Sequence, residues 1–171
     1  MLDALTDAIG NPYILVALVT LLPFLELRAS IPYGIVVLGK DHWPAVFAIA
    51  VVVNILLGPV LYVCLDKLLH LFLRIPAIRR LWERIVVRTQ KRVQPKVERY
   101  GVWGLGFFIG VPLPGSGVYS GSIGGYLLGF SHRKFFFATV IGVLIAGAAV
   151  TAVVLSGVEA LSFLVKDVPP A

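Results

Sequence analysis

The chain has 171 residues, of which 58% are hydrophobic and only 14% are charged, and its mean hydropathy is +0.93. Because a soluble domain usually carries about 25% charged residues, this composition excludes an ordinary soluble domain and indicates an all-α integral membrane protein. The length predicts a single membrane domain over residues 1–171. The formal net charge is +6, which we attribute to a cytoplasmic loop rather than to a nucleic-acid-binding surface.

The first predicted element is a hydrophobic hairpin over residues 12–39, preceded by a short amphipathic helix over residues 1–10. As a helix, the apolar residues 13–25 would reach roughly 20 Å, which is less than the ~30 Å hydrocarbon core. Charges and prolines follow, and residues 29–39 form an apolar return arm. A half-length segment that turns back predicts a re-entrant hairpin, because irregular backbone at membrane depth must be buried in protein or line a wet cavity.

The first predicted membrane-spanning helix covers residues 45–65. These 21 residues carry no charge and match the thickness of the bilayer. Gly58 and Pro59 predict a kink in the helix, and the charged pair Asp66 and Lys67 predicts its end.

Residues 66–100 form a basic connection. Nine of the 15 Lys and Arg residues lie between positions 74 and 99, and apolar residues recur there in steps of three and four. This pattern predicts an amphipathic helix on the cytoplasmic face of the membrane.

A second hairpin is predicted over residues 101–130, with a glycine-rich apolar arm at 101–111 and a return arm at 123–130. A second span follows at residues 135–155, which again carry no charge, and a weakly amphipathic tail covers residues 158–171.

The two hairpin-plus-helix segments, residues 12–65 and 101–157, are predicted to form an inverted repeat. If residues 66–100 are cytoplasmic, the first hairpin enters the membrane from outside and the second from the cytoplasm. A weak echo at an offset of 90 residues supports this: Ser30, Gly34 and Gly39 recur as Ser120, Gly124 and Gly129. We expect a multi-pass protein of the plasma membrane, in a prokaryote the inner membrane.

Glu26 and Arg28 are charged residues inside the first hairpin, within a motif that ends at Pro32. A charge at the centre of a bilayer costs about 2.5–3.5 kcal/mol on the insertion scale, so each needs water or a partner. Residues two apart do not face each other on a regular helix, so either the backbone is extended here or each charge has a different partner. One hypothesis is a proton or cation site at Glu26 and a phosphate site at Arg28. The alternative is an ion pair that only stabilises the bend.

The second hairpin has a proline- and glycine-rich tip without a charged residue. The tip and the start of its return arm contain Pro112, Pro114, Gly115, Ser116, Gly117, Tyr119, Ser120 and Ser122. Unwound segments of this kind coordinate ions and substrate head groups in transporters, and a tight structural turn is the alternative. Asn54, in the middle of a span, either forms a hydrogen bond between helices or belongs to the transport pathway.

No pattern indicates an enzyme or a metal site. The three His residues are isolated, and the sequence contains no cluster with metal-ligand spacing, no nucleophilic elbow and no nucleotide-binding loop. We therefore expect no catalytic residue and no cofactor beyond a coupling H⁺ or Na⁺. Ala138, Gly142 and Ala146 form a ladder of small residues that predicts close helix packing, within the chain or in a homodimer.

The Glu26-Leu27-Arg28 motif and the proline–glycine–serine motif at residues 112–121 resemble the family of putative small multidrug export proteins. That family is similar to the DedA/VTT membrane proteins, which include bacterial lipid-carrier flippases and eukaryotic scramblases. The resemblance covers residues 22–157 and implies two opposed re-entrant hairpins with an acidic residue and an arginine that matter for activity, here Glu26 and Arg28. The arginine common in the second hairpin of DedA proteins is absent, so that hairpin can offer only backbone and hydroxyl groups.

These features together predict a transporter that moves a lipid or another amphiphilic, phosphate-bearing substrate, coupled to a proton or a cation. Its partners would be membrane lipids and its substrate, and not nucleic acid. Two alternatives stay open: an exchanger of small drugs or ions against protons, and a membrane scaffold without transport.

Overall fold

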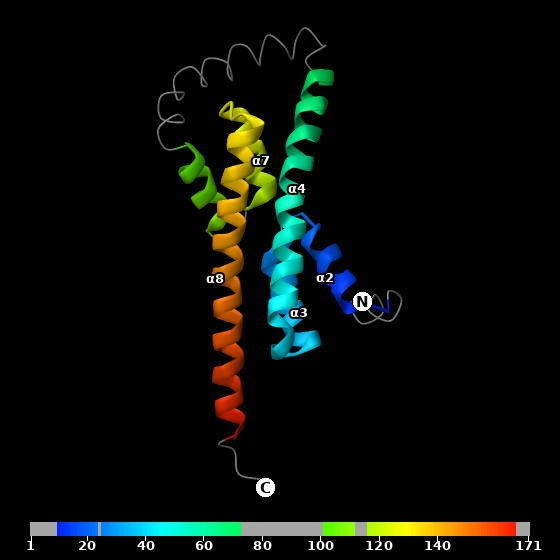
Figure 1. Cartoon of the computed structure of the whole chain (residues 1–171), viewed down its shortest axis with the longest axis vertical. Coiled ribbons are helices and arrows are strands. Elements are labelled where there is room, and N and C mark those ends of the chain that lie inside the picture. Colours follow the sequence, from blue (N-terminus) through cyan, green and yellow to red (C-terminus); the bar gives the residue numbers. More distant parts are fainter. Residues whose placement is uncertain (1–9, 24, 73–100, 112–115, 167–171) are drawn as a thin grey trace. The chain divides into compact units, whose positions relative to one another are not determined.

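The computed structural model describes residues 10–23, 25–72, 101–111 and 116–166 (Figure 1). Over these residues the chain is helical, and the described part contains no strand. The helices, in chain order, are α2 (Pro12–Thr20), α3 (Glu26–Leu38), the 3₁₀ helix η1 (Lys40–His42), α4 (Trp43–Phe72), the helix Gly101–Gly110, α7 (Val118–Leu127) and α8 (His132–Lys166). The expected helices over residues 1–10 and 66–100 lie almost entirely outside the described residues.

Among the described residues, two stretches are long and apolar enough to cross a membrane, Lys40–Leu69 and His132–Gly157. They correspond to the two spans expected from the sequence. By its contacts the chain divides into two compact units, one of Met1–Val53 with Ala146–Ala171 and the other of Asn54–Ile145. We call them unit 1 and unit 2, and α4 and α8 each contribute residues to both.

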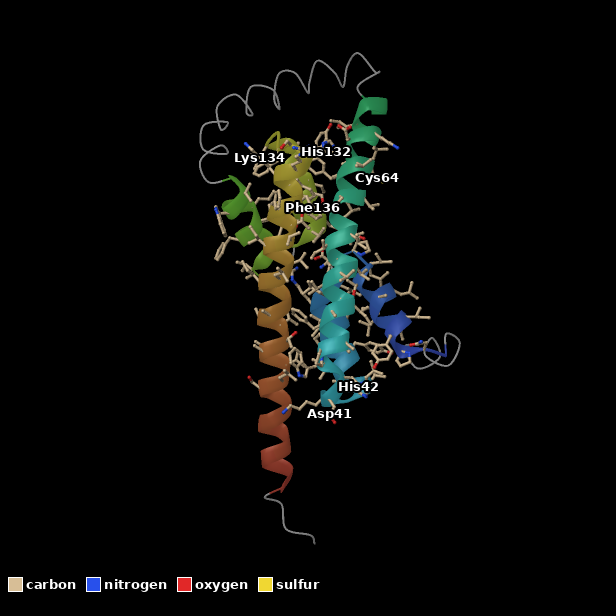
Figure 2. All side chains as sticks on the ribbon, in the orientation of Figure 1. Asp41, His42, Cys64, His132, Lys134 and Phe136 are labelled. Carbon is tan, nitrogen blue, oxygen red and sulfur yellow. The ribbon has the colours of Figure 1, made fainter. Side chains whose placement is uncertain are left out.

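In unit 1, α2 and α3 form an antiparallel helical hairpin. The hydroxyls of Thr20 and Ser30 lie 2.7 Å apart at its tip. At its base, the Tyr13 hydroxyl lies 2.9 Å from Nδ1 of His42, the residue labelled in Figure 2. A Cβ built on Gly34 would come within 2.9 Å of a Val16 methyl and 2.6 Å of a Val46 methyl. Glycine at position 34 therefore lets α3 approach both α2 and the first turns of α4.

In unit 2, the helix Gly101–Gly110 and α7 form a second antiparallel hairpin. A Cβ on Gly121 would come within 2.5 Å of Ile109, and one on Gly125 within 3.1 Å of Leu105. Gly121 and Gly125 thus lie where the two arms touch closely, whereas a Cβ on Gly124 would meet nothing within 4 Å. This packing accounts for a helix that contains residues of low intrinsic helix propensity.

Both return arms begin earlier than predicted. The expected starts were residues 29 and 123, whereas α3 begins at Glu26 and α7 at Val118. Pro32 was expected to belong to the break, but it lies inside α3, where it only removes the N–H that would bond to the carbonyl of residue 28. The prediction was wrong because it treated each proline and glycine as a helix breaker and could not include the packing that stabilises the helix around them.

The expected ends of the two spans were also wrong. Helix α4 does not end at Asp66 but continues to Phe72, and it runs through Gly58 and Pro59 as one helix. Asp66 is compatible with the helix because its carboxylate accepts a hydrogen bond from the Tyr126 hydroxyl. Helix α8 likewise extends from His132 to Lys166, so most of the expected separate tail continues this helix.

Candidate functional site

Glu26 occupies an unusual backbone position at the tip of the first hairpin. It is the first residue of α3, its side chain is 3% exposed, and its φ is +46°, in the left-handed region. It is the one residue other than glycine in the described part of the chain with a positive φ. An L-residue pays about 1–2 kcal/mol for this conformation, so the surrounding structure holds Glu26 against its local preference.

The spacing of Glu26 and Arg28 allowed an extended backbone at this point, and the structure shows a left-handed backbone at Glu26 instead. On a regular helix, side chains that are two residues apart point in different directions. Glu26, however, departs from helical dihedral angles just before the regular part of α3. Its carboxylate interacts electrostatically with the partly exposed Arg28. The structure therefore brings these two predicted site residues together within one hairpin.

Hydroxyl groups surround the same end of α2 and α3. Thr20 and Ser30 are fully buried, and the Thr20 hydroxyl also donates to the carbonyl of Val16. This pair fixes the last turn of α2 against the first turns of α3. The tip is consequently a polar point inside an otherwise apolar hairpin, with Glu26 held firmly in it.

The tip of the second hairpin is described only in part. Pro112, Pro114 and Gly115 lie outside the described residues, while the Ser116 hydroxyl donates to the carbonyl of Val111. Gly117, with φ +135°, precedes the first turn of α7, a conformation that favours glycine.

The hydroxyls of this return arm bond mainly to the local backbone. Ser120 donates to the Gly117 carbonyl at 3.4 Å, and the buried Ser122 donates to the Val118 carbonyl at 2.7 Å. Tyr119, also a predicted site residue, lies partly buried in the first turn of α7. Ser116, Ser120 and Ser122 therefore order the tip and the start of α7, whatever further role they have.

Asn54 is fully buried in α4. Within the described residues, neither its amide nitrogen nor its amide oxygen has a hydrogen-bond partner. The expectation of a simple hydrogen bond between helices thus finds no support there, and Asn54 stays a prediction for the transport pathway. Thr139 in α8 is also fully buried, and its hydroxyl has no hydrogen-bond partner among the described residues. Sequence reasoning missed it because a single threonine in an apolar span is common.

A second group that the sequence did not reveal joins the two apolar helices of unit 2 to α7. The Tyr62 hydroxyl donates to the Phe130 carbonyl, and the Tyr62 ring stacks on Phe135. The ring of His132, which is labelled in Figure 2, meets the Tyr62 ring edge-on. Tyr126 lies beside Tyr62, with ring centroids 5.6 Å apart. The base of the second hairpin is therefore fixed to α4 and α8 by aromatic packing and two tyrosine hydrogen bonds.

Tyr126→Phe is expected to lower the free energy of unfolding by about 1.5–3 kcal/mol, because it removes the 2.8 Å bond to the Asp66 carboxylate at a part-buried position. Unfolding in detergent with a denaturant gives this value. Tyr13→Phe is the control, since its bond to His42 is exposed and water can replace it. An equal effect of the two substitutions would contradict the structural role of the Tyr126 bond.

The ladder of small residues has a partner within the chain. A Cβ on Gly142 would lie 2.6 Å from the Gly106 carbonyl oxygen, and one on Gly106 would lie 3.2 Å from the Ala138 carbonyl oxygen. Ala138 and Gly142 therefore let the helix Gly101–Gly110 pack backbone to backbone on α8. Of the two alternatives, the structure supports packing within the chain.

No group of three or more His, Cys, Asp and Glu side chains that could hold a metal ion is found in the described part of the chain. What the structure offers chemically is a buried carboxylate beside a guanidinium in unit 1, and buried amide and hydroxyl groups in unit 2. Such isolated polar groups in apolar helices are typical of membrane proteins that bind or move polar species.

These features define a small all-helical membrane protein with polar residues inside its apolar helices. Residues 26–149 match the family model described as putative small multi-drug export protein, and the chain belongs to this family. The family description is that of an export protein, so transport is the activity that it indicates. No curated protein and no solved structure matches the chain at a significant level.

Proposed function

We propose that the protein is a transporter of the DedA-like type that translocates a lipid or another amphiphile bearing a phosphate group. The observation that carries the proposal is the buried carboxylate of Glu26 with Arg28 at the tip of an apolar hairpin. Charges inside apolar hairpins are costly and mark functional sites, and Arg is suited to phosphate because its guanidinium forms two parallel hydrogen bonds.

An amphiphile fits a small protein better than a water-soluble drug. A lipid head group needs shelter only for its polar part, while its acyl chains stay in the membrane. The first hairpin tip offers one guanidinium, one carboxylate and two hydroxyls, the groups that bind a polar head group. Water would reach each tip from the side on which its hairpin enters.

The proposed topology is an inverted repeat of two re-entrant hairpins, each followed by a spanning helix. The composition of the two units supports it: each holds one hairpin, the first part of the apolar helix that follows, and the last part of the other apolar helix. An inverted repeat in which the two repeats exchange the last parts of their apolar helices would produce this division. The repeat would place the protein in the plasma membrane with several passes.

The role proposed for Glu26 is to take up a proton or a cation during each cycle. Its carboxylate is 3% exposed and lies in the same hairpin tip as Arg28. Uptake of a proton would neutralise the tip and release the phosphate from Arg28. The protein would work without a resident cofactor, a metal or enzyme chemistry, with membrane lipids around it and a second copy as an optional partner.

A second candidate is the exchange of a small drug against protons, which the description of the family favours. It would use Glu26 in the same way but would take its substrate from water. The two candidates differ in a measurable way, because drug exchange predicts that adding substrate moves protons across sealed vesicles, whereas lipid translocation moves labelled lipid between leaflets.

The experiment that tests the proposal is a scrambling assay in proteoliposomes. Fluorescent lipids in the inner leaflet are protected from a membrane-impermeant quencher until a protein moves them outward. We expect the wild-type protein to remove this protection, and empty liposomes to keep it. Protection that persists with folded wild-type protein at every pH would refute lipid translocation and leave drug exchange as the candidate.

Arg28→Ala is expected to slow the translocation of anionic phospholipids by about ten- to a hundredfold, the equivalent of one charge-assisted hydrogen bond, and to affect a neutral diacylglycerol analogue little. Arg28→Lys is the matched control, since it keeps the positive charge and should retain part of the rate. An equal loss for anionic and neutral lipids would indicate that Arg28 acts on the fold rather than on the substrate.

A further inference from the structure

Unit 2 contains two fully buried polar side chains near the same stretch of α4, one on α4 itself and one on α8. Asn54 and Thr139 are both 0% exposed. Across the described residues, no hydrogen-bond partner reaches either amide atom of Asn54 or the hydroxyl of Thr139. A buried polar group without a partner costs about 1–3 kcal/mol, so two of them near each other call for an explanation.

Gly58 connects the two groups. It lies one helical turn after Asn54, which places both on the same face of α4, with about 5–6 Å between their Cβ positions. A Cβ built on Gly58 would lie 3.2 Å from Oγ1 of Thr139 and 3.4 Å from a methyl group of Val118. The hydroxyl of Thr139 and the first residue of α7 therefore meet at the same turn of α4 that follows Asn54.

The start of α7 determines which kind of ligand this place favours. Val118 is the first residue of α7, and Gly117 before it provides no side chain to cap the helix. The N-terminal end of a helix carries roughly half a positive charge, which favours anions. Asp66 is the one acid among the described residues of unit 2, and it bonds to Tyr126 near the opposite end of α7.

The alternative to an anion site at this place is a cation site. A sodium ion would find an amide oxygen and a hydroxyl oxygen but no carboxylate, and it would face the positive end of α7. An oxyanion would instead accept hydrogen bonds from the Asn54 amide nitrogen and the Thr139 hydroxyl and would be stabilised by the helix end. The electrostatics therefore favour the anion.

We propose that Asn54 and Thr139, together with the N-terminal end of α7, bind the phosphate group of the substrate in unit 2. The inference rests on the proposed function, to which it adds a second phosphate-binding point that involves no charged side chain. Because both side chains are buried and unpaired in this state, they would gain their partner in another state of the transport cycle, and the ligand would stabilise that state through these new contacts. The phosphate could belong to a lipid head group or be free inorganic phosphate.

The first test is the stability of the protein without ligand. Asn54→Leu and Thr139→Val replace each unpaired polar group by an apolar group of similar shape, which removes the penalty of burial. We expect each variant to raise the unfolding midpoint in detergent by about 3 °C or more. A lowered midpoint for both would mean that the two groups have partners in the unliganded protein, and would overturn the inference.

The second test is binding, measured as the rise of the unfolding midpoint of the full chain in detergent. The probes are dihexanoyl phosphatidic acid, dihexanoylglycerol, which lacks the phosphate, and inorganic phosphate. We expect the phosphatidic acid to stabilise the wild type, dihexanoylglycerol to have no effect, and each of the two variants to bind about tenfold more weakly. Stabilisation by inorganic phosphate as well would identify free phosphate as a ligand, and stabilisation by the lipid alone would identify the head group.

Thr151→Val is the matched control. Thr151 is also a buried threonine of α8, 5% exposed, and its hydroxyl likewise finds no partner among the described residues, but it belongs to unit 1. It should show the same gain in midpoint and an unchanged response to phosphatidic acid. An equal loss of binding in Thr151→Val, or no response of the wild type to either phosphate probe, would refute the phosphate site.

This test does not depend on translocation, so the two proposals can fail separately. Binding that is lost in Asn54→Leu and Thr139→Val without any scrambling by the wild type would refute lipid translocation and leave the site. Scrambling by the wild type that both variants retain at the full rate would refute the site and leave the transporter.

Discussion

Glu26→Gln is expected to leave a folded protein whose transport rate no longer changes with pH. Glutamine has the shape of a protonated glutamate but cannot release or take up a proton. If Glu26 is the group whose protonation accompanies each cycle, the wild-type rate varies with pH and the variant rate is flat. The measurement is the rate of lipid scrambling in proteoliposomes as a function of pH, for the wild type and the variant side by side.

Two further variants separate charge from backbone strain. Asp41→Asn changes an exposed acid of η1 in the same unit and should keep the wild-type pH dependence. Glu26→Gly also removes the carboxylate, but glycine adopts φ +46° without strain. Apart from the lost side-chain contacts, the free energy of unfolding of Glu26→Gly should therefore be about 1–2 kcal/mol higher than that of Glu26→Gln. A pH profile in Glu26→Gln identical to that of the wild type would show that another group carries the proton. Loss of the fold in both Glu26 variants would favour the scaffold alternative.

The two spans could be predicted from the sequence because their signal is local. Twenty-one consecutive uncharged residues are enough to recognise a helix that can cross a membrane, and both predicted spans lie within Lys40–Leu69 and His132–Gly157. Their ends could not be predicted in the same way. Asp66 looks like the end of a helix until its bond to Tyr126, 60 residues away, is known.

The hairpins show the same division between local and distant information. A short apolar arm, a tip with prolines and glycines and a second apolar arm predict two antiparallel segments, and two helical hairpins are present. Where each return arm begins depends on distant contacts: Gly121 and Gly125 are helical in α7 because they face Ile109 and Leu105. Propensity alone assigns such glycines to a loop.

The candidate site could be predicted only as a set of residue types. Glu26 and Arg28 stand out by their charge, yet the left-handed backbone of Glu26 leaves no trace in the sequence. Thr139 has no local signal at all. Its interest comes from being fully buried without a partner next to the start of α7, which is a property of the folded chain.

Gly142→Ala is expected to lower the free energy of unfolding by about 1–3 kcal/mol, although it adds one methyl group and raises helix propensity. The added Cβ would lie 2.6 Å from the carbonyl oxygen of Gly106 and 2.6 Å from Cβ of Ile109. Neither atom is the end of a flexible side chain, so the helix Gly101–Gly110 must shift as a whole. Titration of the folded protein with a denaturing detergent measures the loss.

Gly104→Ala distinguishes this close approach from a general effect of glycine. Gly104 lies in the helix Gly101–Gly110, and a Cβ there would meet nothing within 4 Å, so alanine should raise the free energy of unfolding by about 0.5–1 kcal/mol through the lower entropy of the unfolded chain. A lower free energy of unfolding for Gly142→Ala together with a higher one for Gly104→Ala would establish that α8 and this helix touch through their backbones. The same contact positions the helix Gly101–Gly110 on α8, so we also expect Gly142→Ala, and not Gly104→Ala, to slow transport. Changes in the free energy of unfolding of the same sign and size in the two variants would contradict the packing on which the position of α7 depends.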